Sequence, residues 1–528
     1  MTTWFRRWGV NPFRRTPLGA MFGGEVPALP VDIFRVLVGL LSGVYFYETF
    51  REAADFSAPE GLMNHALVQE VFWFTRVGLF QAGIPLVVLH AVFLFAVAAS
   101  WAVVLGWRPK FFAAVLFVIA VSSYRWNFLV TYVDDGVMHL MLFWLLLLPI
   151  GRTLTLAEWR RDGEKAWRRW LGLRVPGTAA GCFLGNLALI YVVAGLWKWT
   201  SPMWRDGTAV AAIAQLPIAR PPDGWGPAAL PWLRLFDYAA LFFEPLFPLM
   251  FILRRGHWLK WVLGLAWFGF HVGIVIILPL GLANFACLAG GVMAFREEIM
   301  AVLGAGDALV PAGPTAGRME ARRDLCGRCA VGFILLLTLA MVRFAPVVRA
   351  VEANRYSAAE MAMDPRGSGG LAVVHEWIYG ALWFAGIAQE YQLFNWIDVR
   401  NYRARYSIVL HDGRQDKNLA PEDFFPGGTR SALLQCYLFD LCWLRVPPQR
   451  NAEVKRCLME GFARRYCAQR QVADGTVELR AELLRVTGVG APRIERPMAR
   501  LFLFHVRAGQ VAGLETPAES PAVREAAP

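Results

Sequence analysis

Apolar residues occur in blocks of about 20 along the first 346 residues, separated by short polar connections. A block of that length crosses a bilayer core of roughly 30 Å, because a helix rises about 1.5 Å per residue. The pattern predicts an all-α polytopic membrane bundle over residues 31–346. We expect about nine transmembrane helices, at residues 31–50, 84–106, 111–126, 132–150, 179–199, 235–253, 258–280, 281–296 and 329–346.

The hydrophobic pattern changes beyond residue 347, where short alternating segments replace the long apolar blocks. The sequence RARYSIVLHDGRQDKNLAP predicts two strands joined at an Asp-Gly turn, and GTVELRAELLRV and RLFLFHVRAG alternate in the same way. Residues 430–467 predict two helices separated at Pro447-Pro448. We therefore expect a small α+β domain over residues 347–510, followed by a disordered tail over residues 511–528.

Charge orients these segments relative to the membrane. The net charge of +12 and 56% hydrophobic residues describe a membrane protein with basic loops. Lys and Arg gather in the N-terminal arm, residues 1–30, and in every second connection after it. By the positive-inside rule the arm and these loops are cytoplasmic, which places the α+β domain outside, in the periplasm of a bacterium. This predicts a multi-pass inner-membrane protein whose partner is the lipid bilayer; no nucleic-acid motif is present.

The cysteines divide between the two predicted compartments. Cys326 and Cys329 form a lone CGRC motif at the start of the last predicted span, without the second pair that a metal site would need. Four more cysteines lie in the outer domain: Cys436, Cys442, Cys457 and Cys467. In an oxidising compartment these four allow one or two disulfides, with three alternative pairings.

Ionisable side chains inside predicted spans are costly to bury and are candidates for functional sites. They are Arg35, Asp134, Asp135, His139, Lys198, Glu244 and His271, with Arg125 at a span end. Counting residues along the helices places His139 roughly 10 Å and His271 roughly 12 Å below the outer ends of their spans. Lys198 lies at the outer end of its own span, so the outer half of the bundle holds all three.

Each candidate also has a structural interpretation. Lys198 either extends to water between interfacial tryptophans or is held away from water, where desolvation disfavours the ammonium form and makes the amine a base. The histidines either bind neighbouring helices or join Lys198. Asp32 lies one turn before Arg35, which predicts an ion pair near the cytoplasmic face. Glu244 precedes Pro245 and is expected to satisfy a backbone group that the proline leaves free.

Three segments together resemble the HTTM family, the membrane domain of vitamin K-dependent gamma-carboxylase and its bacterial relatives. They are YVDDGVMHLMLFWLLLLPIGR, YVVAGLWKWTSPMWRDGTAV and FEPLFPLMFILRRGHW with the FGFHVGIVIILPLG that follows it. The resemblance covers roughly residues 14–345 and is most specific in the second segment. It departs from animal members at Trp197, where they have a second lysine before the base, and in the small size of the outer domain.

The resemblance implies carboxylase- or epoxidase-type chemistry, in the lyase class, on a reduced, vitamin K hydroquinone-like quinone. Lys198 matches the base that deprotonates the hydroquinone, His139 matches the partner of the oxyanion, and His271 is a third member. Dioxygen and carbon dioxide would be co-substrates, and a protein or peptide on the periplasmic side would be the acceptor. Residues expected to line the cofactor site are Trp197, Trp199, Trp204 and Arg125; no metal is implied.

Two other functions fit the same sequence. The chain can be a non-catalytic membrane assembly or maturation factor whose outer domain is a docking platform, with Lys198 an interface anchor. A transporter is the third alternative, but the sequence shows no internal repeat and no pair of interrupted spans. Replacing Lys198 separates the enzyme from the non-catalytic alternative.

Overall fold

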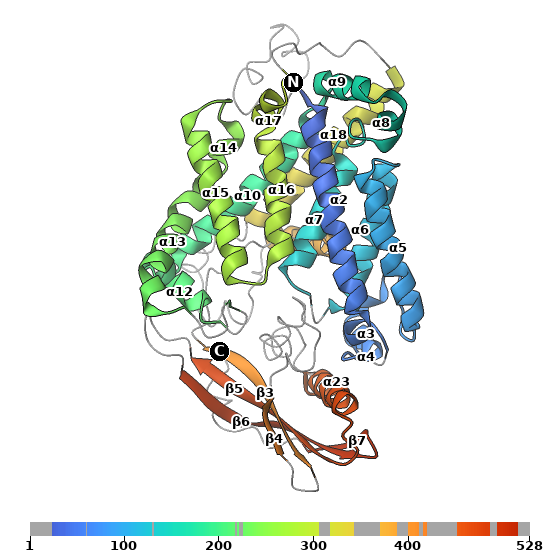
Figure 1. The fold of residues 1–528 in the computed structure, drawn as a ribbon, viewed down its shortest axis with the longest axis vertical. Helices are drawn as coiled ribbons and strands as arrows, with labels where there is room; N and C mark the ends of the chain where they lie inside the picture. The colour runs from blue at the N-terminus through green and yellow to red at the C-terminus, as the bar shows by residue number, and fades with distance from the viewer. Residues whose placement is uncertain are drawn as a thin grey trace.

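The structure, a computed structural model of the chain, describes residues 24–59, 61–128, 131–216, 219–220, 225–305, 317–342, 370–387, 400–410, 415–419, 451–485 and 494–515. Most of these residues form a bundle of helices that run along one common direction, with a small sheet at one end (Figure 1). The longer helices are α2 (Ala28–Arg51), α5 (Leu86–Val104), α6 (Pro109–Trp126), α7 (Val133–Leu147), α10 (Thr178–Thr200), α13 (Leu230–Phe243), α15 (Trp258–Ile277), α16 (Gly281–Ala294) and α18 (Gly317–Val342).

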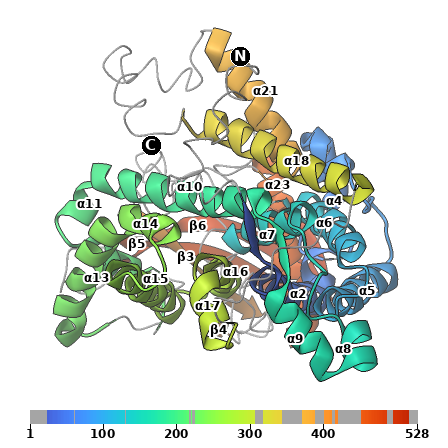
Figure 2. The same cartoon turned by 90° about the horizontal axis from the view of Figure 1, so that it is seen from above.

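Short elements connect these helices. They are β1 (Glu25–Pro27), α3 (Ala53–Phe56), α4 (His65–Val71), η3 (Trp73–Arg76), α8 (Leu156–Asp162), α9 (Glu164–Gly172), β2 (Arg174–Pro176), α11 (Pro202–Arg205), α12 (Ala209–Ile213), η5 (Pro227–Ala229), η6 (Glu244–Leu246), α14 (Leu249–Ile252) and α17 (Arg296–Val302). Strands β1 and β2 pair antiparallel, which joins the start of α2 to the start of α10. Seen from above, α10 and α18 lie side by side along one edge of the bundle, and α8 and α9 lie at the opposite edge (Figure 2).

Five helical segments among the described residues are long and apolar enough to cross a bilayer. They are Ala28–Arg51, Leu86–Val104, Thr178–Thr200, Pro227–Ile252 and Trp258–Ile277. The apolar helices Gly281–Ala294 and Leu325–Ala340 are shorter. Helix α7 has 15 residues, so it rises only roughly 22 Å. The chain thus has the helical membrane architecture that its pattern predicts, whereas nine spans and the domain boundaries remain predictions.

A buried ion pair joins the first span to two other segments. The guanidinium of Arg35 donates to the carboxylate of Asp32 at 2.7 Å, as the sequence predicts, and both side chains are fully buried. Asp32 also accepts from the backbone N–H groups of residues 151–153, at 2.6, 2.9 and 2.6 Å. Arg35 donates to the carbonyls of residues 103, 104, 153 and 154. Because both charges are paired and hydrogen-bonded, their burial is tolerated.

The two aspartates at the start of α7 hold helix ends together. Asp134 accepts from the backbone N–H groups of Leu282 and Ala283, at 3.2 and 2.9 Å, and so caps the N-terminus of α16. Asp135 accepts from the N–H of Tyr132 at 3.0 Å and from the hydroxyl of Tyr45 at 2.7 Å. Both carboxylates therefore have structural partners, and neither contacts Lys198.

The C-terminal region contains a five-stranded antiparallel sheet with strand order β4-β3-β5-β6-β7. The strands are β3 (Arg400–Leu410), β4 (Gln415–Leu419), β5 (Gly475–Arg485), β6 (Ile494–Arg507) and β7 (Gln510–Glu515). The predicted strands in residues 403–421, 475–486 and 500–509 are confirmed, while the Asp-Gly turn itself lies outside the described residues. The prediction of a disordered tail from residue 511 is wrong over its first five residues, because they pair with β6 in β7.

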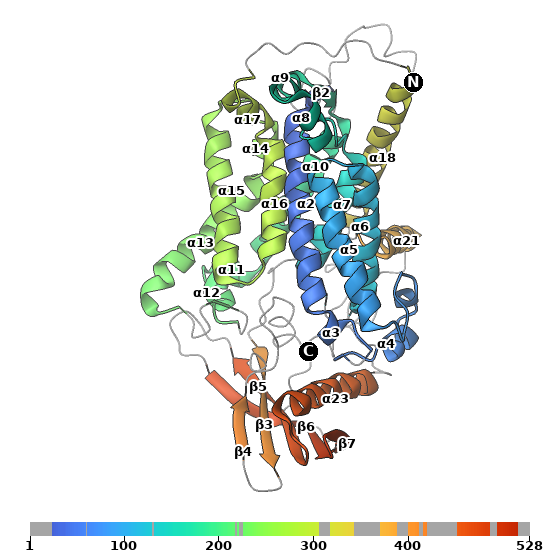
Figure 3. The same cartoon turned by 45° about the vertical axis from the view of Figure 1, so that its right-hand side comes forward.

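Helix α23 (Asn451–Arg470) packs against β6 and β7 and also reaches the bundle. The guanidinium of Arg465 forms an ion pair with the buried carboxylate of Asp55 in α3. Gly461 lies against the backbone of Leu62, where a Cβ atom would be 2.9 Å from the Leu62 Cα. The helix thus lies between the sheet and the end of the bundle that carries α3 and α4 (Figure 3).

Two predictions in this region fall partly outside the described residues. The first of the two helices predicted in residues 430–467 lies there, as do Cys436 and Cys442. Cys457 and Cys467 lie ten residues apart on α23, about 15 Å along the helix axis, so they cannot bond to each other. Cys467 is a buried free thiol whose pKa is raised to about 11 by burial.

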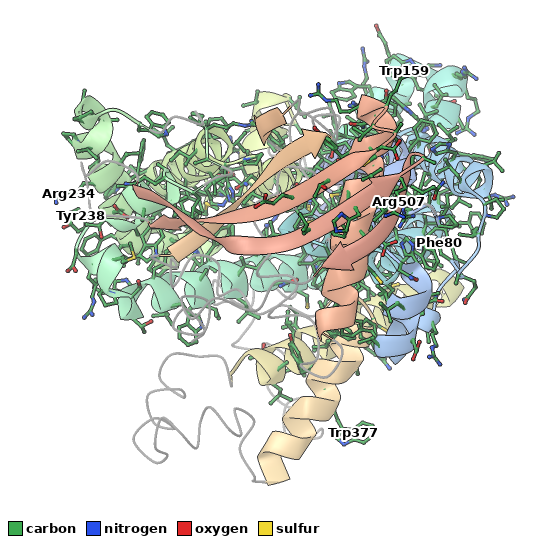
Figure 4. The ribbon with its side chains drawn as sticks, turned by 90° about the horizontal axis from the view of Figure 1, so that it is seen from below. Phe80, Trp159, Arg234, Tyr238, Trp377 and Arg507 are labelled. Atoms are coloured by element: carbon green, nitrogen blue, oxygen red, sulfur yellow. The ribbon has the colours of Figure 1, made fainter. Side chains whose placement is uncertain are left out.

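Helix α21 (Gly370–Phe384), which the sequence assigned to the outer domain, packs on the bundle. It contacts α18, and the ring of Trp383 lies 4.3 Å from that of Phe74. Trp377 on the same helix is 77% exposed and points away from the rest of the protein (Figure 4). The chain therefore returns to the helical bundle before it enters the sheet.

Candidate functional site

Lys198 lies in the last turn of α10 and is buried inside the protein. Its ammonium is 2.7 Å from the carboxylate of Glu244 in η6, and the two side chains are 3% and 4% exposed. The ring of Trp204, in α11, lies 5.2 Å from the same nitrogen. An anchor that reaches water would be exposed at the surface of the bundle. The burial of Lys198 favours the alternative in which the lysine is held away from water.

A glycine brings the two charged residues together. Gly195 lies three residues before Lys198, and a Cβ atom there would meet Pro245 at 2.8 Å from its Cδ and 2.9 Å from its nitrogen. The absence of a side chain therefore lets α10 approach the turn that carries Glu244. The sequence predicted that Glu244 would satisfy a backbone group beside Pro245. The structure instead pairs its carboxylate with Lys198, because a buried ammonium needs a counter-charge.

Polar atoms near the end of α10 have no partner within the described part of the chain. The indole nitrogen of Trp197 and the hydroxyl of Ser201 are both buried and make no hydrogen bond. Ser201 caps the C-terminus of α10, where its backbone N–H donates to the carbonyl of Lys198 at 3.1 Å. Trp199 instead donates to the carbonyl of Leu241 at 2.9 Å. Of the three expected cofactor tryptophans, only Trp197 thus has a buried donor that remains available to a ligand.

His271 belongs to a closed hydrogen-bond network in α15, α10 and α16. Its Nδ1 lies 2.8 Å from the amide oxygen of Asn284, and its Nε2 lies 2.8 Å from the hydroxyl of Tyr191, which accepts from the indole of Trp267 at 2.6 Å. Asn284 donates to the carbonyl of Leu280, which fixes its amide orientation. An amide oxygen accepts only, so Nδ1 of His271 donates to Asn284, and both ring nitrogens are hydrogen-bonded.

His139 lies on a different side of the bundle from Lys198. Its Nδ1 is 3.2 Å from the carbonyl of Gly386, just beyond α21, and its ring packs edge-on against Tyr124 of α6 at 5.3 Å. A carbonyl accepts only, so Nδ1 carries the proton, and the buried Nε2 has no hydrogen-bond partner among the described residues. In Figure 2, α10 runs away from α7 toward α11, so the end that carries Lys198 lies on the α13 side.

Arg125, expected beside the cofactor, lies in the His139 region. It donates to the carbonyl of Val77 at 2.7 Å and to the carbonyl of Phe384, and its guanidinium stacks over the Phe384 ring at 4.2 Å. These contacts fix the end of α21 to the bundle. Across the described ranges, no hydrogen bond, ion pair or ring contact joins Lys198, His139 and His271 to one another.

Sequence reasoning missed the roles of Glu244, Gly195 and Ser201. The signal for Gly195 was its spacing of three residues from a buried lysine, which places both on one side of α10. The signal for Glu244 was that its predicted span follows the span that holds Lys198, and the two residues have opposite charge. The region that the structure describes contains no group of three or more potential metal ligands. Comparison with family models, curated proteins and solved structures found no match to this chain.

Proposed function

We propose that this chain is an integral membrane enzyme of the gamma-carboxylase type that uses Lys198 as a base on a reduced quinone. The buried Lys198–Glu244 pair is the observation that carries the proposal. The equally buried Lys260–Glu298 pair has the same geometry, and the Lys198 site differs from it by the unpartnered Trp197 indole and Ser201 hydroxyl beside the pair. The same proposal includes a protein or peptide acceptor and its carboxylation, and both are drawn from the resemblance to the HTTM family.

The pair gives Lys198 a way to act as a base inside the protein. Transfer of a proton from Nζ to the carboxylate of Glu244 leaves a neutral amine without changing the charge of the pair. When the amine then takes a proton from a hydroxyl group of the substrate, the new ammonium lies beside the neutral carboxyl of Glu244, and the oxyanion formed on the substrate balances its charge. A positioned base of this kind contributes roughly 10²–10⁴-fold in rate.

The unpartnered polar atoms beside Lys198 fit a hydroxylated aromatic ligand. The Trp197 indole can donate to an oxygen of the ring, and the Ser201 hydroxyl can donate or accept. The ring of Trp204 supplies an apolar wall. The reduced quinone supplies the reaction with dioxygen that generates the strong base needed for carboxylation. His139 does not join this group in the structure. Its Nε2 has no hydrogen-bond partner among the described residues, and we propose that it contacts the substrate separately from Lys198.

Lys198→Arg tests the proposal, because arginine can keep the ion pair with Glu244 but does not give up its proton. We expect this variant to be as inactive as Lys198→Ala in the oxygen-dependent conversion of a hydroquinone to its epoxide by purified protein in detergent. Lys260 offers a matched control, since it is also buried and lies 2.8 Å from a carboxylate, that of Glu298. Lys260→Arg should keep activity.

Full activity of Lys198→Arg at matched expression would refute the catalytic role of Lys198. That result would favour the non-catalytic alternative, an assembly or maturation factor. One observation fits that alternative, namely that α23 fastens the sheet to the bundle through Arg465 and Asp55. We propose the inner membrane as the location, with the sheet on the periplasmic side, from the alternation of basic loops.

A further inference from the structure

The helical hairpin formed by α8 and α9, residues 156–172, carries an unbalanced surface charge. Residues 152–174 contain seven Lys or Arg and three Asp or Glu. The hairpin lies at the end of the bundle opposite to the sheet, between the end of α7 and the start of α10 (Figures 1 and 3). Neither the lysine site nor its proposed chemistry makes use of this surface.

The acidic residues of the hairpin are used within it. Glu158 accepts from the indole of Trp170 at 2.7 Å and lies 3.5 Å from the guanidinium of Arg169. Asp162 binds Arg169 at 3.0 Å and Arg161 at 3.1 Å. These guanidinium groups lower the pKa of Asp162, so its carboxylate stays ionised and stays engaged with them. The third acid, in the first turn of α9, stabilises the helix N-terminus.

The remaining cations face solvent. Arg160, Lys165 and Arg168 are exposed, and no ion pair engages them in the described part of the chain. Trp159, next to Arg160, is 48% exposed and lies at the periphery of the bundle (Figure 4). The inner face of the hairpin is closed by Trp170, whose side chain is buried. Exposed cations beside an exposed tryptophan at the end of membrane helices suit the headgroup region of a bilayer.

We propose that the α8–α9 hairpin binds the headgroups of anionic phospholipids in the leaflet next to this end of the bundle. The hairpin is complementary to phosphate oxygens, because its acids are paired within it while three of its cations are left without ion pairs within the described ranges. Trp159 fixes the depth of the hairpin by placing its ring among the headgroups and upper acyl chains. Each such cation contributes about 1 kcal/mol near an anionic surface, or about a five-fold factor in affinity.

Native mass spectrometry of the full chain in a neutral detergent tests this, with titration of phosphatidylglycerol and, in parallel, phosphatidylcholine. We expect preferential binding of phosphatidylglycerol. Arg160→Gln with Arg168→Gln should weaken that binding roughly 30-fold. Arg51, in the last turn of α2, and Arg507, in β6, are both exposed at the sheet end of the structure and provide a charge-matched control.

The control double variant, Arg51→Gln with Arg507→Gln, should change phosphatidylglycerol binding by less than about three-fold. Replacing Arg160 and Arg168 by lysine should retain binding, which separates charge from any effect on folding. Equal binding of the two lipids, or equal loss in the two glutamine double variants, would overturn the proposal. Loss of binding in the lysine variant would also contradict it, since the charge would then be present without the affinity.

Discussion

Replacing Lys198 and Glu244, separately and together, measures what the buried pair contributes to the free energy of unfolding. At 2.7 Å and an effective dielectric of about 20, their attraction is about 6 kcal/mol, which offsets the cost of taking both charges out of water. Lys198→Met leaves an unpaired buried carboxylate, and Glu244→Leu leaves an unpaired buried ammonium. Each should destabilise the protein by about 3–5 kcal/mol. The double variant, which removes both charges, should lie close to the wild type.

The assay is the unfolding midpoint of the full chain in mixed micelles, followed by tryptophan fluorescence and helical circular dichroism. The strong non-additivity is the diagnostic feature, because neighbouring residues in one ion pair do not contribute independently. Epoxide formation is measured on the same samples. A double variant that is stable but inactive would separate the catalytic contribution of the pair from its structural one.

Two results would refute this reasoning. If Lys198→Met unfolds like the wild type, the pair is not a buried, desolvated contact. If the double variant recovers both stability and activity, the amine is not the base, and the proposed chemistry fails while the structural pairing stands.

Two further perturbations follow from the structure. Gly195→Ala places a Cβ atom 2.8 Å from Pro245 Cδ and should cost about 1–3 kcal/mol in thermal unfolding with a loss of activity, whereas Gly269→Ala, whose Cβ would have nothing within 4 Å, should be neutral or stabilising. Burial lowers the pKa of His65, stacked on Trp126, to about 4. The unfolded chain therefore binds the proton first, and stability should fall by roughly 3 kcal/mol as the pH drops from about 6.5 to 4. The stability advantage of the wild type over His65→Phe should shrink across that window; a constant difference would contradict the assignment.

The long apolar helices were predictable because their signal is local. A block of 20 apolar residues predicts both a helix and its length from the block alone. The alternation of apolar and polar residues in β5 and β6 predicts strands in the same way. Strand β7 gave no such signal, since its six residues are held by pairing with β6 rather than by their own pattern. Helix α21 was placed in the outer domain because it follows the last predicted span, and its packing against α18 is a long-range contact that no local pattern encodes.

Sequence reasoning could assign the candidate residues a depth but not a position around the bundle. The rise per residue predicts that Lys198, His139 and His271 lie in the outer half, and this depth stays a prediction. It could not tell which side of the bundle each helix occupies, and the structure separates His139 from Lys198 for that reason. The pairing of Lys198 with Glu244, 46 residues later in the chain, is a long-range contact that no local periodicity encodes.

The contacts of Asp32 and Arg35 bear on how the chain is made. The partners of this pair lie at residues 103–104 and 151–154, which leave the ribosome after the first helix has already been delivered to the membrane. During synthesis this helix therefore carries an Asp32–Arg35 pair whose bonds to the other two segments are not yet available. The pair is fully hydrogen-bonded only after α5, α6, α7 and residues 151–154 have been made. One ion pair in α2 therefore makes the final packing of an early helix depend on a segment synthesised more than 100 residues later.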